Sequence, residues 1–236
     1  MKKTLLKESL SQRISDILRL EIIKNAIKED EFFNETELAT RFGVSRGPVR
    51  EALRILETDC LVATQPNGRT KVLAITADDC RAHYDLHRFF ENESIRRIIA
   101  SSNEKDYSKW LDKMAYYLEQ DRRCAMTNDV GGFFVYDNEF HKSFLTFANN
   151  RVYTRLWENE NRIISGIMQA NLNFLAHVQH VDLNDVTEKH QYILDGLVQR
   201  DLQKSLDALN NHLDFGLVTY LSILEDFRKI NSTQSK

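Results

Sequence analysis

The distribution of proline restricts the fold of this chain more than any other sequence feature. Proline occurs twice among 236 residues, at Pro48 and Pro66, and nowhere after residue 66. Because proline interrupts helices, its absence leaves room for long helices over more than two thirds of the chain. The chain has only 8 glycines, too few for a β-sandwich or barrel, which needs a turn about every 8–12 residues. With 42% apolar residues the chain can also bury a core, so a mostly α-helical globular protein is predicted.

Charge divides the chain near residue 75. The first 75 residues carry 13 basic and 11 acidic side chains, net +2, whereas the rest carries 19 and 24, net −5. This asymmetry indicates different partners for the two parts. The overall charge of −3 is therefore an average and does not exclude a nucleic-acid partner.

Signals for export or membrane insertion are not found in the sequence. The first ten residues, MKKTLLKESL, contain no apolar core of a signal peptide, and no run reaches the 18 or more apolar residues of a membrane helix. The three cysteines, Cys60, Cys80 and Cys124, form no CxxC pair, as is typical of a reducing compartment. We expect a cytoplasmic protein without a membrane partner.

The first 75 residues alternate helix, turn and hairpin signals. Apolar residues recur with a helical period from Leu5 to about Ile27. A capping pattern at 34–37 predicts the start of a second, short helix, which Gly43 can end by adopting a positive φ.

Ser45 can cap a third helix that runs to about Thr58 and holds Pro48 in its first turn, where a missing N–H is tolerated. Two short strands are expected at 61–64 and 69–73, around the turn Pro66-Asn67-Gly68. This order predicts a winged helix-turn-helix over residues 1–75.

Long helical patterns fill the remainder of the chain. They predict an all-α antiparallel helical bundle over residues 78–228, followed by a polar tail at 229–236. The six expected helices span about 78–100, 104–127, 129–148, 150–178, 184–199 and 201–229.

The third helix presents an arginine face. At 100° per residue, Arg46, Arg50 and Arg54 fall within about 80° of one another, while Val49 and Leu56 occupy another side. Arginine on a helix can bind guanine in the major groove or grip phosphate. A solvated arginine face is the alternative, but the preceding short helix, glycine turn and following hairpin favour DNA binding.

The run from Asn34 to Glu57 closely resembles the GntR family of bacterial transcription factors, most specifically in Gly-Val-Ser-Arg-Gly-Pro-Val-Arg-Glu-Ala-Leu at 43–53. The resemblance implies a homodimer that binds a short palindromic operator. Two departures are Thr36, where many members carry serine or arginine, and Cys60, where glycine is usual. The predicted DNA contacts, from the pattern and the resemblance together, are Thr36, Ser45, Arg46, Gly47, Arg50, Arg54, Asn67 and Gly68.

Four polar residues point from apolar helix faces into the expected core of the bundle. Asp137 and His141 share a face beside Phe144, because they stand four residues apart. His190 and His212 occupy apolar faces of two later helices. A buried carboxylate is costly unless it is paired or bound to a cation, so a metal site is favoured. Satisfied core histidines, or an isolated Asp137–His141 pair, are the alternatives.

The same positions resemble the ligand-binding domain of the FadR subfamily of GntR regulators. The matching stretches are Asp137-x-x-Phe140-His141, then Glu188-x-His190, then Ala208-x-x-x-His212-Leu213. The resemblance, which covers about residues 10–225, implies an FCD-type domain that holds a divalent metal ion through Asp137, His141, His190 and His212. Zinc is the first candidate, with nickel and manganese also compatible with imidazole ligands.

The resemblance further implies a small carboxylate effector, such as a sugar acid or hydroxy acid, bound near the metal. His87, Arg88 and Arg162 are the candidate effector contacts, and His83 with His87 could instead form an extra metal or anion contact or be structural. We therefore expect an effector-responsive transcriptional regulator, with repression the commoner habit of the family, and no enzyme. A regulator with a purely structural metal and an all-helical metalloenzyme are the alternatives.

Overall fold

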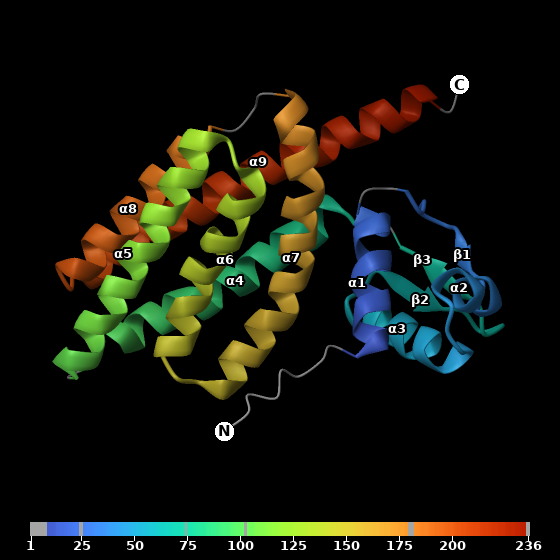
Figure 1. The fold of residues 1–236 in the computed structure, drawn as a ribbon, viewed down its shortest axis with the longest axis horizontal. Helices are drawn as coiled ribbons and strands as arrows, with labels where there is room; N and C mark the ends of the chain where they lie inside the picture. Colours follow the sequence, from blue (N-terminus) through green and yellow to red (C-terminus); the bar gives the residue numbers. More distant parts are fainter. Residues whose placement is uncertain (1–8, 24–25, 74, 102, 179–181, 235–236) are drawn as a thin grey trace. The chain divides into compact units, whose positions relative to one another are not determined.

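The computed structural model describes residues 9–23, 26–73, 75–101, 103–178 and 182–234, with backbone alone at 166–178, 223–224 and 226–234 (Figure 1). The chain separates into two compact units, Met1–Thr76 and Ala77–Lys236. None of the described helices is long and apolar enough to cross a membrane. The predicted fold class, a winged helix-turn-helix followed by an all-α bundle, is confirmed.

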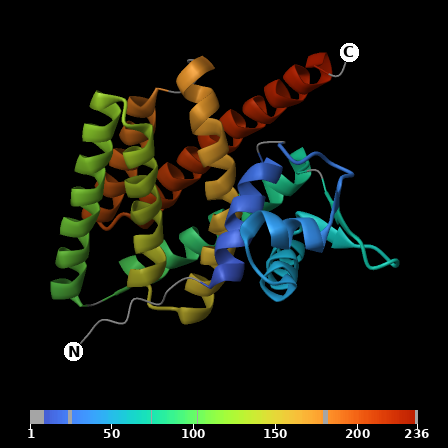
Figure 2. The same cartoon turned by 45° about the vertical axis from the view of Figure 1, so that its right-hand side comes forward.

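Within its described part, the first unit contains three helices and a small antiparallel sheet with strand order β1-β3-β2. Strand β1 was not predicted, since its two residues are too few for a periodic signal; Phe32 pairs with Lys71 and Phe33 with Thr70. Figure 2 shows the hairpin between β2 and β3 extending away from the helices of the unit. The elements are α1 (Leu10–Ile23), β1 (Phe32–Phe33), α2 (Glu35–Phe42), α3 (Arg46–Thr58), β2 (Val62–Thr64) and β3 (Thr70–Val72).

The ends of α2 follow the predicted capping signals. The Asn34 side chain accepts hydrogen bonds from the backbone N–H groups of Thr36 and Glu37, and Gly43 ends the helix with φ +64°. Ser45 occupies the N-cap position of α3, but its side chain makes no capping hydrogen bond, which leaves the hydroxyl available to other partners. Pro48 is the third residue of α3, within the first turn as expected.

The connection after α3 is made without glycine. Cys60 adopts φ +57°, a left-handed conformation that costs a residue with a side chain about 1–2 kcal/mol. Beside it, Asp59 accepts from the buried guanidinium of Arg19 at 2.5 Å, and this ion pair joins α1 to the end of α3. The turn is thus held by an interaction that the sequence pattern did not show.

The three helices of this unit share one apolar core. Leu18 of α1 and Val49 and Leu56 of α3 are fully buried, and Val62 and Val72 bring the hairpin onto the same core. This packing fixes one face of α3 against the domain, so its opposite face remains exposed.

The described residues of the second unit form six helices, at positions close to those predicted. They are α4 (Ala77–Ile99), α5 (Glu104–Thr127), α6 (Val130–Phe147), α7 (Arg151–Val178), α8 (Leu183–Val198) and α9 (Leu202–Gln234). The expected polar tail at 229–236 needs correction, because the backbone stays helical through Gln234. Polar residues do not end a helix unless they offer a competing turn or cap.

The helices of the bundle surround a core of aromatic and aliphatic side chains. Figure 1 shows α5, α6 and α7 side by side, with the long α4 and α9 crossing them obliquely. Phe140, Phe144 and Trp157 are among the largest fully buried side chains. At the α8–α9 turn a Cβ on Gly196 would lie 2.7–3.0 Å from atoms of Ser205, so glycine permits the close approach of these two helices. The approach brings the histidines of α8 and α9 toward α6.

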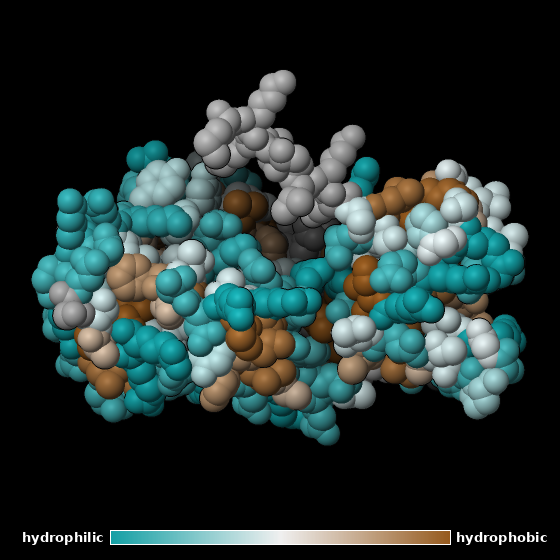
Figure 3. Space-filling model, turned by 90° about the horizontal axis from the view of Figure 1, so that it is seen from below, coloured by the Kyte–Doolittle hydropathy of each residue, from teal (hydrophilic) through white to brown (hydrophobic). Residues whose placement is uncertain are grey.

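The face of the molecule drawn in Figure 3 is mostly hydrophilic. On this face, hydrophobic residues form separate small patches between hydrophilic ones. Exposed apolar side chains scattered in this way are ordinary for a folded protein. The informative exceptions are therefore the polar groups inside the bundle.

Candidate metal centre and DNA-reading surface

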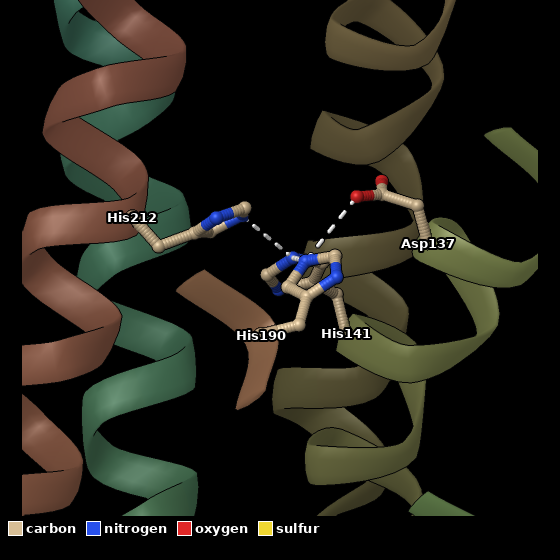
Figure 4. Close-up of side chains that lie close together, drawn as sticks. All are labelled: Asp137, His141, His190 and His212. Atoms are coloured by element: carbon tan, nitrogen blue, oxygen red, sulfur yellow. Dashed lines mark hydrogen bonds and ion pairs between the residues drawn. The ribbon is translucent and has the colours of Figure 1, made fainter. Parts of the chain in front are cut away.

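Four polar side chains from three helices converge inside the bundle. Asp137 and His141 come from α6, His190 from α8 and His212 from α9 (Figure 4). His141 Nε2 lies 3.0 Å from His212 Nε2 and 3.3 Å from His190 Nε2, and His190 Nε2 lies 3.3 Å from Asp137 Oδ1. One ligand atom from each residue lies within 4.8 Å of the others.

This donor set fits a first-row divalent cation. All four residues are buried, and three imidazole nitrogens with one carboxylate oxygen are ligands that zinc, nickel and manganese accept. An ion with bonds of about 2.1 Å separates neighbouring ligand atoms by roughly 3.0–3.4 Å, which matches the measured nitrogen–nitrogen distances. The isolated Asp137–His141 pair does not describe the site, because His190 and His212 join it.

The outward nitrogens of two imidazoles are held by carboxylates. Glu91 of α4 accepts from His141 Nδ1 at 2.7 Å and from Trp157 Nε1 at 3.1 Å. Asp121 of α5 lies 3.1 Å from His190 Nδ1. A carboxylate on Nδ1 leaves the Nε2 lone pair facing the other ligands, which is the usual arrangement around metal-bound histidine.

Burial determines the protonation of the histidines. It lowers the pKa of His190 to about 4 and the pKa of His212 well below its usual value, so both imidazoles are neutral at pH 7. Burial also opposes a charge on His141, but the adjacent Glu91 outweighs it and raises the pKa of His141 to about 9. A cation at this cluster would therefore displace a proton from His141, because ligands bind metal in the deprotonated form.

The two carboxylates that support the histidines differ in charge. Burial opposes ionisation of Glu91, but His141 outweighs it and lowers the pKa of Glu91 to about 2. Burial raises the pKa of Asp121 to about 8 and also raises that of Asp137. A nearby divalent cation favours the ionised form of both aspartates.

A cavity of about 60 Å³ adjoins the cluster, and Asp137, His141 and His212 are among its lining residues. At about 10–15 Å³ per water-sized position, it holds a few water-sized groups beside the ligand atoms. A small ligand in it would reach the open side of a bound cation.

The candidate effector contacts are placed differently from one another. His87 is buried and lines the cavity, where its Nδ1 lies 3.5 Å from Glu91 Oε1. Arg88 instead pairs with Asp214, and Arg162 bonds Asn159 at 2.5 Å; neither arginine lines this cavity. Arg88 is held by a partner on α9 and Arg162 by a partner on its own helix. The periodicity of apolar residues, from which helix faces are predicted, does not reveal such partners.

His83 and His87 do not form a joint site. His83 Nδ1 binds Glu160 Oε2 at 2.7 Å, whereas His87 faces Glu91. The described contacts therefore place the two histidines in separate surroundings.

Two inward carboxylates were missed in the sequence, Glu91 and Asp121, both fully buried. A signal existed for each: Glu91 shares a helical face with Ser94 and Ile98, and Asp121 shares one with Leu118. Both contact imidazoles, Glu91 that of His141 and Asp121 that of His190, so each can orient a ligand of a bound cation.

Replacing Glu91 with glutamine is expected to weaken zinc binding by about 10- to 100-fold, because the neutral amide no longer supports His141. Competition with a chromophoric chelator measures this affinity. Glu93→Gln is the matched control, since Glu93 lies on the same helix and pairs with Arg97 outside the cluster. Equal zinc affinity in the two variants would contradict the supporting role of Glu91.

All eight predicted DNA contacts are exposed on the first unit. Gly47 has no packing requirement in this unit, since an added Cβ would meet only Ser45 Oγ at 3.9 Å. At the hairpin tip Gly68 adopts φ +78°, and Asn67 Oδ1 accepts from the backbone of Arg69 at 3.0 Å. The tip is therefore shaped by residues that also offer polar atoms to a partner.

One acidic residue organises the arginine face of α3. Glu35, the first residue of α2, accepts from Arg46 Nη2 at 2.7 Å and from Arg50 Nε at 2.8 Å. These charge-assisted hydrogen bonds lower the pKa of Glu35. Arg54 lies 3.7 Å from Glu51 on its own helix and does not join this cluster. Sequence reasoning missed Glu35, because its two partners become neighbours only when α2 packs on α3.

Comparison with known protein families identifies the family to which each of the two units corresponds. The family described as "Bacterial regulatory proteins, gntR family" matches residues 10–72, and the FCD domain family matches residues 82–215, more than half of the chain. The chain belongs to the GntR family. This GntR-family protein is a transcriptional regulator with an FCD domain, and not an enzyme.

Relatives of this GntR-family regulator include characterised repressors. The gluconate operon transcriptional repressor of Bacillus subtilis is 23% identical over 215 residues, 90% of this chain and 85% of the repressor. The repressor RspR of Escherichia coli is 24% identical over 228 residues, which cover 97% of this chain and 93% of the RspR chain. A GntR-family structure from Pseudomonas syringae pv. tomato is 27% identical with a TM-score of 0.56, and the match covers 94% of this chain and 89% of that one.

Proposed function

We propose that this GntR-family regulator is a repressor whose operator binding is controlled by a small carboxylate held beside a divalent cation in the bundle. The observation that carries the proposal is the convergence of three imidazole nitrogens and the Asp137 carboxylate beside a cavity. A buried polar cluster of this kind is unfavourable without a cation or a full set of hydrogen bonds.

The DNA-reading half of the proposal rests on α3 and the hairpin. Arg46, Arg50 and Arg54 would enter the major groove, with Ser45 and Thr36 on phosphates and Asn67 at the minor groove. Two copies of the chain would form a homodimer and read a palindrome, because half-sites lie about 34 Å apart on one face of DNA.

The effector class follows from the cation and from the size of the cavity. A carboxylate oxygen is a good ligand for zinc, and nickel or manganese would accept it as well. The repressor of Bacillus subtilis to which this chain is similar is named for a gluconate operon, which supports a sugar acid or hydroxy acid. The cavity of about 60 Å³ favours a small acid.

Control would operate through a population shift. An acid that contacts the cation and the walls of the cavity binds one arrangement of the helices better and favours it. In a dimer that arrangement would alter the separation of the two reading helices, and a shift of a few ångströms is enough to lose one half-site.

Electrophoretic mobility shift with the zinc-loaded full chain tests the proposal. The DNA is a site selected by this protein from a random pool, and the probe acid is gluconate. We expect gluconate to change the affinity for this site by at least about fivefold, and a chelator to abolish the change. A chelated protein that responds equally to gluconate would show a purely structural cation.

A further inference from the structure

The lining of the cavity beside the cluster contains acidic side chains but no lysine or arginine among its described residues. The two carboxylates among these residues are those of Glu91 and Asp137. Three basic residues adjacent in sequence to lining residues, Arg88, Lys142 and Arg162, contact Asp214, Glu158 and Asn159 instead. Once a bound cation has displaced the proton of His141, the positive charge available to a ligand in this cavity is that of the cation.

The remaining polar side chains of the lining can form hydrogen bonds with a ligand. His87 is 5% exposed, and its Nε2 has no hydrogen-bond partner among the described residues. Asn161 donates through Nδ2 to Asn138 Oδ1, which leaves each amide a second polar atom. The Tyr84 hydroxyl, whose pKa burial raises, stays protonated and is a donor. Neutral donors and acceptors of this kind suit hydroxyl groups.

We propose that the cavity selects acids with one carboxylate and several hydroxyls, and rejects dicarboxylates of the same length. The inference rests on the proposed function, in which one carboxylate coordinates the cation. A second carboxylate would lie near Glu91 and Asp137 and the amides of the lining, desolvated and without a lysine or arginine partner among the described residues. Rejection by an unpaired charge is a common source of specificity.

His87 is the specificity-determining residue in this proposal. Its Nε2, without a hydrogen-bond partner among the described residues, gains one from a ligand hydroxyl. One imidazole nitrogen compensates a buried carboxylate less than the bidentate fork of a guanidinium would. Arginine at this position would add a guanidinium to the lining. The variant His87→Arg should therefore admit a second carboxylate.

Isothermal titration calorimetry of the zinc-loaded full chain tests the inference with matched acids. Three pairs differ only in a terminal CH₂OH or carboxylate: glycerate and tartronate, threonate and tartrate, gluconate and glucarate. We expect the monocarboxylate to bind at least about 30-fold more tightly in the pair that fits best. Butyrate, which lacks the hydroxyls of threonate, should bind at least about tenfold more weakly than threonate.

Two variants sharpen the test. His87→Arg should reduce the preference for the monocarboxylate at least about tenfold, while zinc content and thermal unfolding stay near those of the natural chain. His83→Arg is the control, because it adds the same charge one turn earlier on α4, where His83 binds Glu160 outside the lining.

The outcomes separate the inference from the proposed function. Equal or tighter binding of the dicarboxylate in every pair overturns the inference and leaves carboxylate sensing intact. A preference that His87→Arg leaves unchanged also overturns the role given to His87. Zinc-loaded protein that binds none of the six acids contradicts the proposed function and the inference together.

Discussion

Replacing His190 with alanine is expected to abolish binding of the proposed cation. His190 is fully buried, and its Nε2 lies 3.3 Å from both His141 Nε2 and Asp137 Oδ1, so no other side chain can take its place. Its removal also leaves Asp121 without its imidazole partner. Elemental analysis should show a fall from about one metal ion per chain to less than one tenth.

Two further variants check this result. The double variant His190→Ala, His212→Ala removes two of the three imidazoles and should show no metal above background. His83→Ala removes a histidine that binds a carboxylate, Glu160, outside the cluster, and should keep its metal. Unchanged metal content in the double variant would exclude the cluster as the metal site. Acidification should act in the same direction, since protons compete for the ligand nitrogens.

Replacing Arg50 with alanine is expected to lower affinity for the selected DNA site about 10- to 100-fold, with the bundle and its metal content unchanged. Glu35 accepts from the Nε of Arg50 and so orients the guanidinium, whose far end carries the two amino groups that would contact guanine bidentately in the proposed complex. A lost bidentate contact costs about 1–3 kcal/mol. Gel-shift titration at fixed salt measures the change.

Charge and geometry can be separated at this position. Arg50→Lys keeps the positive charge but loses the planar fork, so it should recover non-specific binding without recovering specificity. Arg13→Ala is the control, because Arg13 is exposed on α1 and carries the same charge outside the predicted DNA contacts. Wild-type affinity in Arg50→Ala would show that α3 is not the reading helix.

Helical phase predicted much of the candidate site. Asp137 and His141 stand four residues apart, and both were expected to face the core, as were His190 and His212. The structure brings these four together from α6, α8 and α9. The prediction succeeded because a polar residue on an apolar helix face has to find a partner inside the protein.

The partners of those residues followed no local pattern. Glu91 supports His141 from 50 positions away, and Asp121 supports His190 across 69. Glu35 likewise joins Arg46 and Arg50 only through the packing of α2 on α3. Such pairs depend on how two packed helices are rotated and shifted against each other. The residue pattern of one helix taken alone does not specify this arrangement.

Proline illustrates the division between local and tertiary information. Helical periodicity uninterrupted by proline beyond residue 66 was enough to predict six helices and the faces they bury, because backbone hydrogen bonding and side-chain period are local properties. Only tertiary packing decided that Arg88 binds Asp214 while His87 lines the cavity. The two residues are adjacent in sequence, but successive helical positions point about 100° apart, and the neighbouring helices determine what each one meets.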